Sequence, residues 1–202
     1  MMTTEKNRFY GKPIDYTIRE LKKNPKYDAN WIEQAAKILI DNEAITESIL
    51  APFNAESLYL ISKVYNAENP ETMTLIEFLR DQTSKLNTSQ IDVILQAWVD
   101  GVHTFNILFA LADPSLPYSK TACIAKAATM GEDLFNLNDI NQYNAEQLNE
   151  ICMWIALMMD YKVYCDPSIS ATDMKLIREM LNDGRTVEID GSFIKIMRKN
   201  EF

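Results

Sequence analysis

Apolar residues recur at helical spacing along most of this chain, and the runs open with a shared local pattern. The pattern is clearest in residues 143–167, where Tyr143 precedes Asn144, a residue whose side-chain oxygen suits a helix N-cap. Gln147 stands three positions after the cap, the spacing of a capping box, and Leu148 completes a hydrophobic staple with Tyr143. The stretch therefore predicts a capped amphipathic helix, followed by a short second segment that ends at a proline.

Six openings of this kind occur, spaced between 25 and 33 residues apart. Periods of this length indicate helix-pair repeats, whose units stack because one unit cannot bury its apolar face alone. The alternative is a helical bundle in which each helix merely has a good cap. The segments NAEQL, NAESL and SATDM share an alanine as well as the cap, which favours true repeats. The residues that begin the openings, each followed by its predicted cap, are Tyr27, Phe53, Leu86, Tyr118, Tyr143 and Ile169.

These patterns predict a mainly α fold of degenerate helix-pair repeats, which form either a compact bundle or a short solenoid. Three parts are expected: a lead at residues 1–26, a helical-repeat domain at 27–184, and a C-terminal β-hairpin with a tail at 185–202. The lead is predicted to be polar and partly disordered at its start and to contain a short helix over residues 14–23.

The hydrophobic period changes from helical to alternating after Gly184. Residues 186–189 and 192–197 are typical of strands, and residues 190–191 of a tight turn between them. Because an isolated hairpin is only marginally stable in water, we expect it to dock on the helices or to pair with a further strand. Residues 9–10, Phe-Tyr, are the candidate for that third strand.

Composition is that of an ordinary globular chain, with 47% hydrophobic and 24% charged residues among 202. Only five glycines are present, and neither GxxxxGK[ST] nor GxGxxG occurs, so nucleotide hydrolysis and dinucleotide binding are not expected. His103 is the only histidine, and the cysteines, Cys123, Cys152 and Cys165, lack metal-ligand spacing. We therefore expect no catalytic residues, no metal site and no cofactor, and the protein is not predicted to be an enzyme.

Two observations bear on the compartment. Cysteines that fall within helical patterns behave as small buried hydrophobes, which indicates a reducing environment. The sequence begins without an apolar run of the kind found in signal peptides, and its longest apolar stretch, residues 151–159, is too short to span a bilayer. A cytoplasmic protein without membrane association is the expectation.

The net charge of −9 comes from 29 acidic and 20 basic residues. Direct nucleic-acid binding is not expected, because it depends on Lys and Arg side chains that displace counterions from phosphates. A protein partner with a basic surface would suit this charge, and so would competition with nucleic acid for a basic groove. The simpler alternative is that the charge only keeps the protein soluble.

Two kinds of residue are candidates for contact with a protein partner. Trp31 stands where Gln90 and Gln147 stand in other repeats, which predicts that it is exposed beside Tyr27, and exposed aromatic residues often anchor interfaces. Ordinary packing of Trp31 is the alternative. The second kind is paired carboxylates, which would otherwise be solvated faces: Glu43 with Glu47, Glu132 with Asp133, and Glu146 with Glu150.

Residues 143–167, followed by SISATDMKLIREMLNDG at 168–184, resemble a known repeat. It is the repeat of about twenty-five residues, F-S-x-x-Q-M-x-x-I-R-x-G-L…Y-A-x-P, of uncharacterised proteins from mobile elements of gut bacteria. The resemblance is fair over residues 27–52 and 86–114. It implies a helical-repeat protein of accessory or phage origin and supplies no functional residues. We therefore predict a non-catalytic protein-binding module. The alternative is an acidic, anti-CRISPR-like inhibitor that mimics nucleic acid and blocks a nucleic-acid-handling host defence complex.

Overall fold

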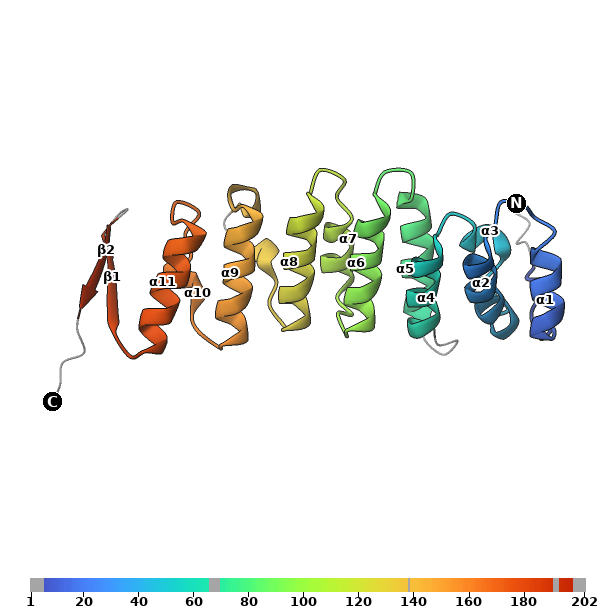
Figure 1. Ribbon diagram of the computed structural model, residues 1–202, viewed down its shortest axis with the longest axis horizontal. Coiled ribbons are helices and arrows are strands. Elements are labelled where there is room, and N and C mark those ends of the chain that lie inside the picture. Colours follow the sequence, from blue (N-terminus) through green and yellow to red (C-terminus); the bar gives the residue numbers. More distant parts are fainter. Residues whose placement is uncertain (1–5, 66–69, 138, 191–192, 198–202) are drawn as a thin grey trace. The chain divides into compact units, whose positions relative to one another are not determined.

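The computed structural model describes residues 6–65, 70–137, 139–190 and 193–197. The chain forms two compact units, Met1–Leu116 and Pro117–Phe202, each built mainly from helices (Figure 1). The predicted mainly α fold is therefore confirmed. The boundary between the units falls inside the predicted repeat region, at the start of its fourth repeat.

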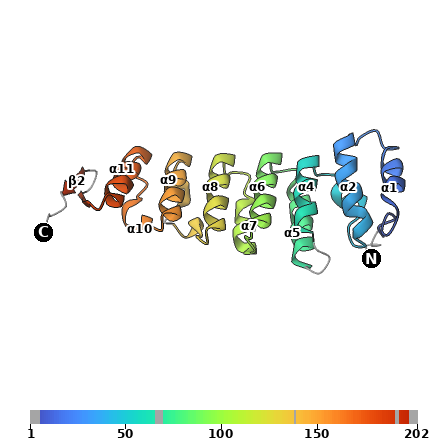
Figure 2. The same ribbon diagram turned by 60° about the horizontal axis from the view of Figure 1, so that its bottom comes forward.

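In the first unit the leading helices of successive repeats stand side by side in sequence order (Figure 1). Helix α1 packs on α2, α2 on α4, and α4 on α6, while the second helices α5 and α7 lie together on one side of this row (Figure 2). The described helices of this unit are α1 (Ile14–Leu21), α2 (Ala29–Asp41), α3 (Glu47–Leu50), α4 (Ala55–Val64), α5 (Pro70–Gln82), α6 (Thr88–Val99) and α7 (Phe105–Leu111).

The second unit repeats this arrangement and ends in a hairpin. Helix α8 packs on α9, α9 on α11, and α11 on strand β1. Its described elements are α8 (Tyr118–Thr129), the 3-10 turns η1 (Leu134–Asn136) and η2 (Ile140–Gln142), α9 (Ala145–Ala156), α10 (Tyr161–Tyr164), α11 (Ala171–Asn182), β1 (Thr186–Asp190) and β2 (Phe193–Met197).

The predicted hairpin is confirmed, with one change in its bounds. Strands β1 and β2 pair antiparallel from Thr186 opposite Met197 to Asp190 opposite Phe193, so Asp190 belongs to the strand and not to the turn. Residues 191–192 lie outside the described part of the chain. The hairpin docks on α11 through β1, where Val187 is buried. Docking on the helices was expected, because a hairpin by itself is only marginally stable in water.

The segment before α1 is packed against α2 where the structure describes it, at residues 6–12. Phe9 is buried, at 1% exposure, and lies in a turn. The predicted disordered start is therefore wrong for these residues, and residues 9–10 do not form a third strand. This segment also satisfies the last carbonyl groups of α2, a helix that ends without glycine: the Asn7 amide donates to Leu39 (2.6 Å) and Asn42 (2.5 Å), and the Gly11 N–H donates to Ile40 (2.9 Å).

The predicted helix starts are confirmed at five of the six openings. Asn144 and Gln147 form the reciprocal capping box, with the Gln147 N–H donating to Asn144 Oδ1 (2.9 Å) and the Asn144 N–H to Gln147 Oε1 (2.8 Å). The staple residues Tyr143 and Leu148 are both buried. The other side chains that accept from the first turn as predicted are Asp28, Asn54, Asn87 and Ser170.

The fourth opening lies two residues earlier than predicted. Helix α8 has Pro117 at its N-cap, so Tyr118 is the first helical residue and its side chain is 49% exposed. Leu116, which is buried, takes the place before the cap that was assigned to Tyr118. The error arose because proline cannot cap through a side chain, so the serine that follows Tyr118 looked like the better cap.

A side chain three residues after the cap links three of the repeats to the next one. In each case its N–H donates to the carbonyl of the residue that precedes the cap of the first helix of the next repeat. A capping box accounts only for the oxygen of a glutamine at this position, whereas the amide nitrogen remains free for this second role. The bonds are Trp31 Nε1 to Phe53 (2.9 Å), Gln90 Nε2 to Leu116 (2.8 Å) and Gln147 Nε2 to Ile169 (2.7 Å).

These bonds correct the prediction for Trp31. Its side chain is 5% exposed and stacks on Tyr27 with ring centroids 3.7 Å apart. It occupies the glutamine position because its indole N–H makes the same bond that the glutamine amides make. Trp31 is therefore a packed residue that joins two repeats. The expectation that it is exposed was wrong, and the alternative of ordinary packing is confirmed.

A recurring turn directly precedes the residues that receive the two glutamine bonds. Asp166 Oδ1 accepts from the N–H (2.9 Å) and hydroxyl (2.6 Å) of Ser168, and Pro167 stands between them. Asp113 and Ser115 repeat these two bonds around Pro114, at 2.8 and 2.7 Å. The repetition of turn, cap and linking side chain supports repeats over a bundle with unrelated caps.

Candidate functional site

A cavity of about 870 Å³ opens in the second unit, and we call it the acidic cleft. It is formed by the loop that carries η1 and η2, by helix α10 and by the turn that precedes α11. Its lining residues are Gly131, Glu132, Asp133, Asn136, Leu137, Asp139, Gln142, Tyr143, Tyr161, Lys162, Val163, Cys165, Asp166 and Pro167.

Four carboxylates and one ammonium group line the acidic cleft. Glu132 and Asp133 were predicted as a candidate pair, and the structure brings them together with Asp139 and Asp166, which the sequence reasoning missed. Charge density along the chain is the signal that finds them. Residues 131–167 contain seven acidic residues and one basic residue, so this segment carries −6 of the net charge of −9.

Glu132 is held in place by two neighbours from α10. The Tyr161 hydroxyl donates to Glu132 Oε2 at 2.9 Å, and Lys162 Nζ lies 3.9 Å from the same oxygen. Burial, together with the hydrogen bond to Glu132, raises the pKa of Tyr161 far above its usual range. Tyr161 therefore keeps its proton at neutral pH and acts as a donor that positions the carboxylate.

The other carboxylates of the acidic cleft shape the loops that carry them. Asp133 Oδ1 accepts from the N–H of Phe135 (3.0 Å), and Asp139 Oδ1 accepts from the N–H of Asn141 (3.2 Å). Asp139 has a positive φ of 51°, a backbone region that aspartate tolerates because its side chain bonds locally. An ionised carboxylate has about four acceptor positions, so each group retains capacity for a cationic partner.

The inner wall of the acidic cleft holds its ionisable groups in the neutral form. The Tyr143 hydroxyl donates to the carbonyl of Cys165 at 2.9 Å, and burial raises the pKa of Tyr143. Burial also raises the pKa of the Cys165 thiol to about 12. A thiol with that pKa is not a nucleophile at neutral pH, since only the thiolate attacks.

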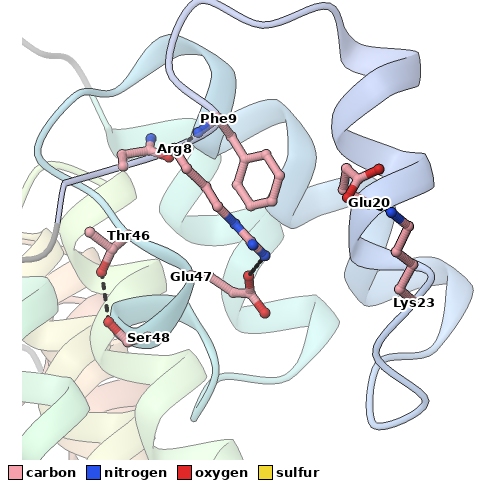
Figure 3. A network of polar contacts seen from close by, with 8 residues as sticks. Arg8, Phe9, Glu20, Lys23, Thr46, Glu47 and Ser48 are labelled. Carbon is pink, nitrogen blue, oxygen red and sulfur yellow. Dashed lines mark hydrogen bonds and ion pairs between the residues drawn. The ribbon is translucent and has the colours of Figure 1, made fainter.

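Tyr27 and Glu47 meet in the first unit, beside a smaller cavity of about 400 Å³. Arg8 pairs with Glu47 at 3.0 Å, next to Phe9 (Figure 3). Burial, and then the neighbouring Glu47 carboxylate, raise the pKa of Tyr27. Since Arg8 offsets the charge of Glu47, this cavity has no excess of negative charge, unlike the acidic cleft.

The remaining predicted carboxylates do not join either cavity. Glu43 and Glu146 are exposed, as expected for solvated faces. Glu150 differs, because it is buried at 8% exposure and forms an ion pair with Arg178 of α11. The interpretation of Glu146 and Glu150 as one solvated acidic face is therefore wrong: Glu150 ties α9 to α11.

Reactive groups elsewhere in the described chain do not form a second chemical site. His103 is exposed and lies edge-on to Trp98, with ring centroids 4.7 Å apart. Within the described residues no cluster of three His, Cys, Asp or Glu side chains is arranged to hold a metal ion. None of the described helices has the length and apolar character needed to cross a bilayer.

Comparison of the chain with family models, curated proteins and solved structures found no match.

Proposed function

We propose that this protein is a non-catalytic protein-binding module, of the accessory type encoded by mobile elements, whose partner presents basic groups to the acidic cleft. The observation that carries the proposal is the cleft itself, about 870 Å³ with four carboxylates and a single lysine on its wall. Clefts lined by charge of one sign focus the electric field and attract partners of the opposite sign.

The protonated state of the cleft's other groups supports binding over catalysis. The raised pKa values of Tyr161 and Cys165 keep these side chains neutral, so neither supplies a base or a nucleophile at neutral pH. The carboxylates are tied to loop N–H groups or to Tyr161, which fixes their positions for recognition.

Affinity capture from a lysate of the source cell tests the proposal. The informative variant is Glu132→Gln with Asp166→Asn, which removes two charges and keeps the acceptors, because each residue uses one oxygen for its bonds to Tyr161 or Ser168. The matched control is Glu43→Gln with Glu56→Gln, two exposed residues outside the acidic cleft. We expect a partner that wild type and control retain, that the cleft variant loses, and that high salt releases. Equal retention by all three proteins would contradict the proposal.

The second candidate function is the acidic inhibitor of a nucleic-acid-handling host defence complex. The four carboxylates of the acidic cleft favour it, because a nucleic-acid mimic must present clustered negative charge to a basic groove. Competition separates the two candidates. If the captured partner binds DNA or RNA and this protein displaces the nucleic acid, the inhibitor is supported; if the partner binds both at once, only the binding module is.

A further inference from the structure

Helix α9 ends with a methionine in a position where three other helices of the described chain have a glycine. Its last turn closes with the Met158 N–H donating to Ile155 (2.9 Å) and the Met159 N–H donating to Trp154 (3.0 Å), the Schellman arrangement. This arrangement places Met158 in the left-handed region, at a φ of 56°. Helices α6, α8 and α11 close in the same way with a glycine at this position: Gly101, Gly131 and Gly184.

The Met158 side chain receives no packing that would offset the strain. It is 97% exposed, the highest value among the large apolar residues that the structure describes as exposed. A bulky residue with positive φ is uncommon, and strained backbone persists most often at functional sites. The combination of strain and full exposure therefore points to a role outside the folding of this chain.

The repeats provide an internal comparison for the rest of this helix end. Nine residues after the cap, α9 has Met153, and thirteen residues after it, Leu157; they are 37% and 46% exposed. Four residues apart, they lie on one face of the helix, next to Met158. The equivalent residues of α6, α8 and α11 are mostly polar: Gln96, Lys126 and Glu179 at the first position, and Asp100, Met130 and Asp183 at the second.

A cavity of about 390 Å³ lies beside Met158 and adjoins the acidic cleft. Met130, Ile155 and Met159 supply the rest of its apolar wall, and Glu132, Tyr161 and Lys162 belong to both cavities. An apolar surface at the end of α9 thus continues directly into a region lined by carboxylates. Methionine-rich surfaces of this kind adapt to apolar side chains because the thioether is flexible and polarisable.

We propose that Met153, Leu157 and Met158, with the cavity beside Met158, dock the apolar face of an amphipathic basic segment of the partner. This inference rests on the proposed function, and it assigns the lysines and arginines of that segment to the acidic cleft. Charge selects this occupant. A second copy of a chain with a net charge of −9, a nucleic acid and an anionic lipid surface would each bring like charge to the carboxylates.

The test uses a fluorescent peptide of about 18 residues, or five helical turns, with leucines on one face and lysines on the other. Fluorescence anisotropy measures its affinity for wild type, for Leu157→Ser with Met158→Gly, and for Tyr118→Ser, an exposed aromatic residue of the same unit. We expect the double variant to bind at least about tenfold more weakly, as loss of central apolar anchors does, and Tyr118→Ser to match wild type. Glycine is the residue that other helix ends use here, so the loss is not expected to reflect unfolding.

A peptide of the same composition with leucines spread around the helix is expected to bind weakly and without dependence on Leu157 or Met158. Equal affinity of the double variant and wild type for the amphipathic peptide would overturn the inference. If Glu132→Gln with Asp166→Asn nevertheless lowers the affinity for that peptide, the proposed function stands without the further inference. If neither variant lowers the affinity, the proposed function and the further inference both fail. Two other results would also overturn it: dimerisation that the double variant loses, or wild-type binding to phosphatidylcholine vesicles in place of the peptide.

Discussion

Replacing Met158 by glycine is expected to stabilise the second unit by about 1 kcal/mol. The left-handed conformation costs a residue with a side chain about 1–2 kcal/mol, and glycine removes that cost. Glycine also gives the unfolded chain more freedom, which takes back about 0.4–1 kcal/mol. No packing term enters, because the Met158 side chain is 97% exposed.

The reverse substitution at an equivalent helix end provides the control. Gly131 has a φ of 88°, and a methyl group added there would meet no atom within 4 Å. Gly131→Ala therefore introduces backbone strain without a clash and is expected to destabilise the same unit by about 1 kcal/mol. If Met158→Gly raises stability and Gly131→Ala lowers it, both changes are explained by the left-handed conformation at the helix end.

Urea denaturation followed by circular dichroism measures both changes. With a slope of about 2 kcal/mol per molar urea, a change of about 1 kcal/mol moves the midpoint by about 0.5 M at constant slope. Destabilisation by Met158→Gly would refute the reasoning, since it would mean that the methionine packs against the folded chain. An unchanged free energy of unfolding in Gly131→Ala would also refute it, because the left-handed conformation would then carry no energetic penalty for a residue with a side chain.

Two further predictions concern contacts that join the repeats, and a third concerns a buried thiol. Gln147→Met removes the donor to Pro167 and Ile169 and the acceptor for the Asn144 N–H, and the groups left unpaired are expected to cost about 2–3 kcal/mol in urea denaturation. Arg178→Met leaves Glu150 without its partner and is expected to cost about 3–5 kcal/mol, most of which the double variant with Glu150→Gln should recover in thermal melts. The Cys165 thiol, with its pKa raised from 9.0 to about 12, favours the folded state fully below pH 9. Stability is therefore expected to fall as the pH rises from 9 toward 12, and alanine at this position should flatten that fall in urea midpoints measured across the range.

Helix starts were predictable from the sequence because their chemistry is local. Asn144 and Gln147 bond each other's backbone N–H within one turn, so four residues of sequence contain the whole interaction. The same locality explains the failure at Pro117, where the cap has no side-chain donor or acceptor to detect. Local rules find a cap by its polar side chain, and this helix begins without one.

The role of Trp31 was not predictable by the same reasoning, because its partner lies in the next repeat. The Phe53 carbonyl is 22 residues away, and only the stacking of repeats brings it to the indole N–H. Because Gln90 and Gln147 are polar, the aligned tryptophan was expected to lie on an exposed polar face. The three side chains instead have in common that each carries an N–H group that donates to the next repeat. The property conserved among these three repeats is therefore a side-chain N–H donor, and not the polarity of the whole side chain.

The acidic cleft was half predictable. Glu132 and Asp133 are adjacent in the sequence, so they were found as a pair, but Asp139 and Asp166 reach the cleft from a separate part of its loop and from a turn beyond α10. No helical or strand periodicity relates these four positions, because loops and turns carry all of them. The local charge of residues 131–167 is visible in the sequence and selects this segment over the pair at Glu43 and Glu47.

Repeats also change how a functional surface can be recognised in a chain that has no matched relative. Equivalent positions of the repeats show which residue types the fold favours there. A different residue type in one repeat therefore calls for an explanation other than the fold. Gly101, Gly131 and Gly184 adopt the left-handed conformation at a helix end without steric strain. Met158 adopts the same conformation with the strain that its side chain introduces. That cost is not offset by packing in the described chain, and the same helix end also replaces polar residues by Met153 and Leu157. These two departures together are the reason for proposing that this helix end contacts another molecule.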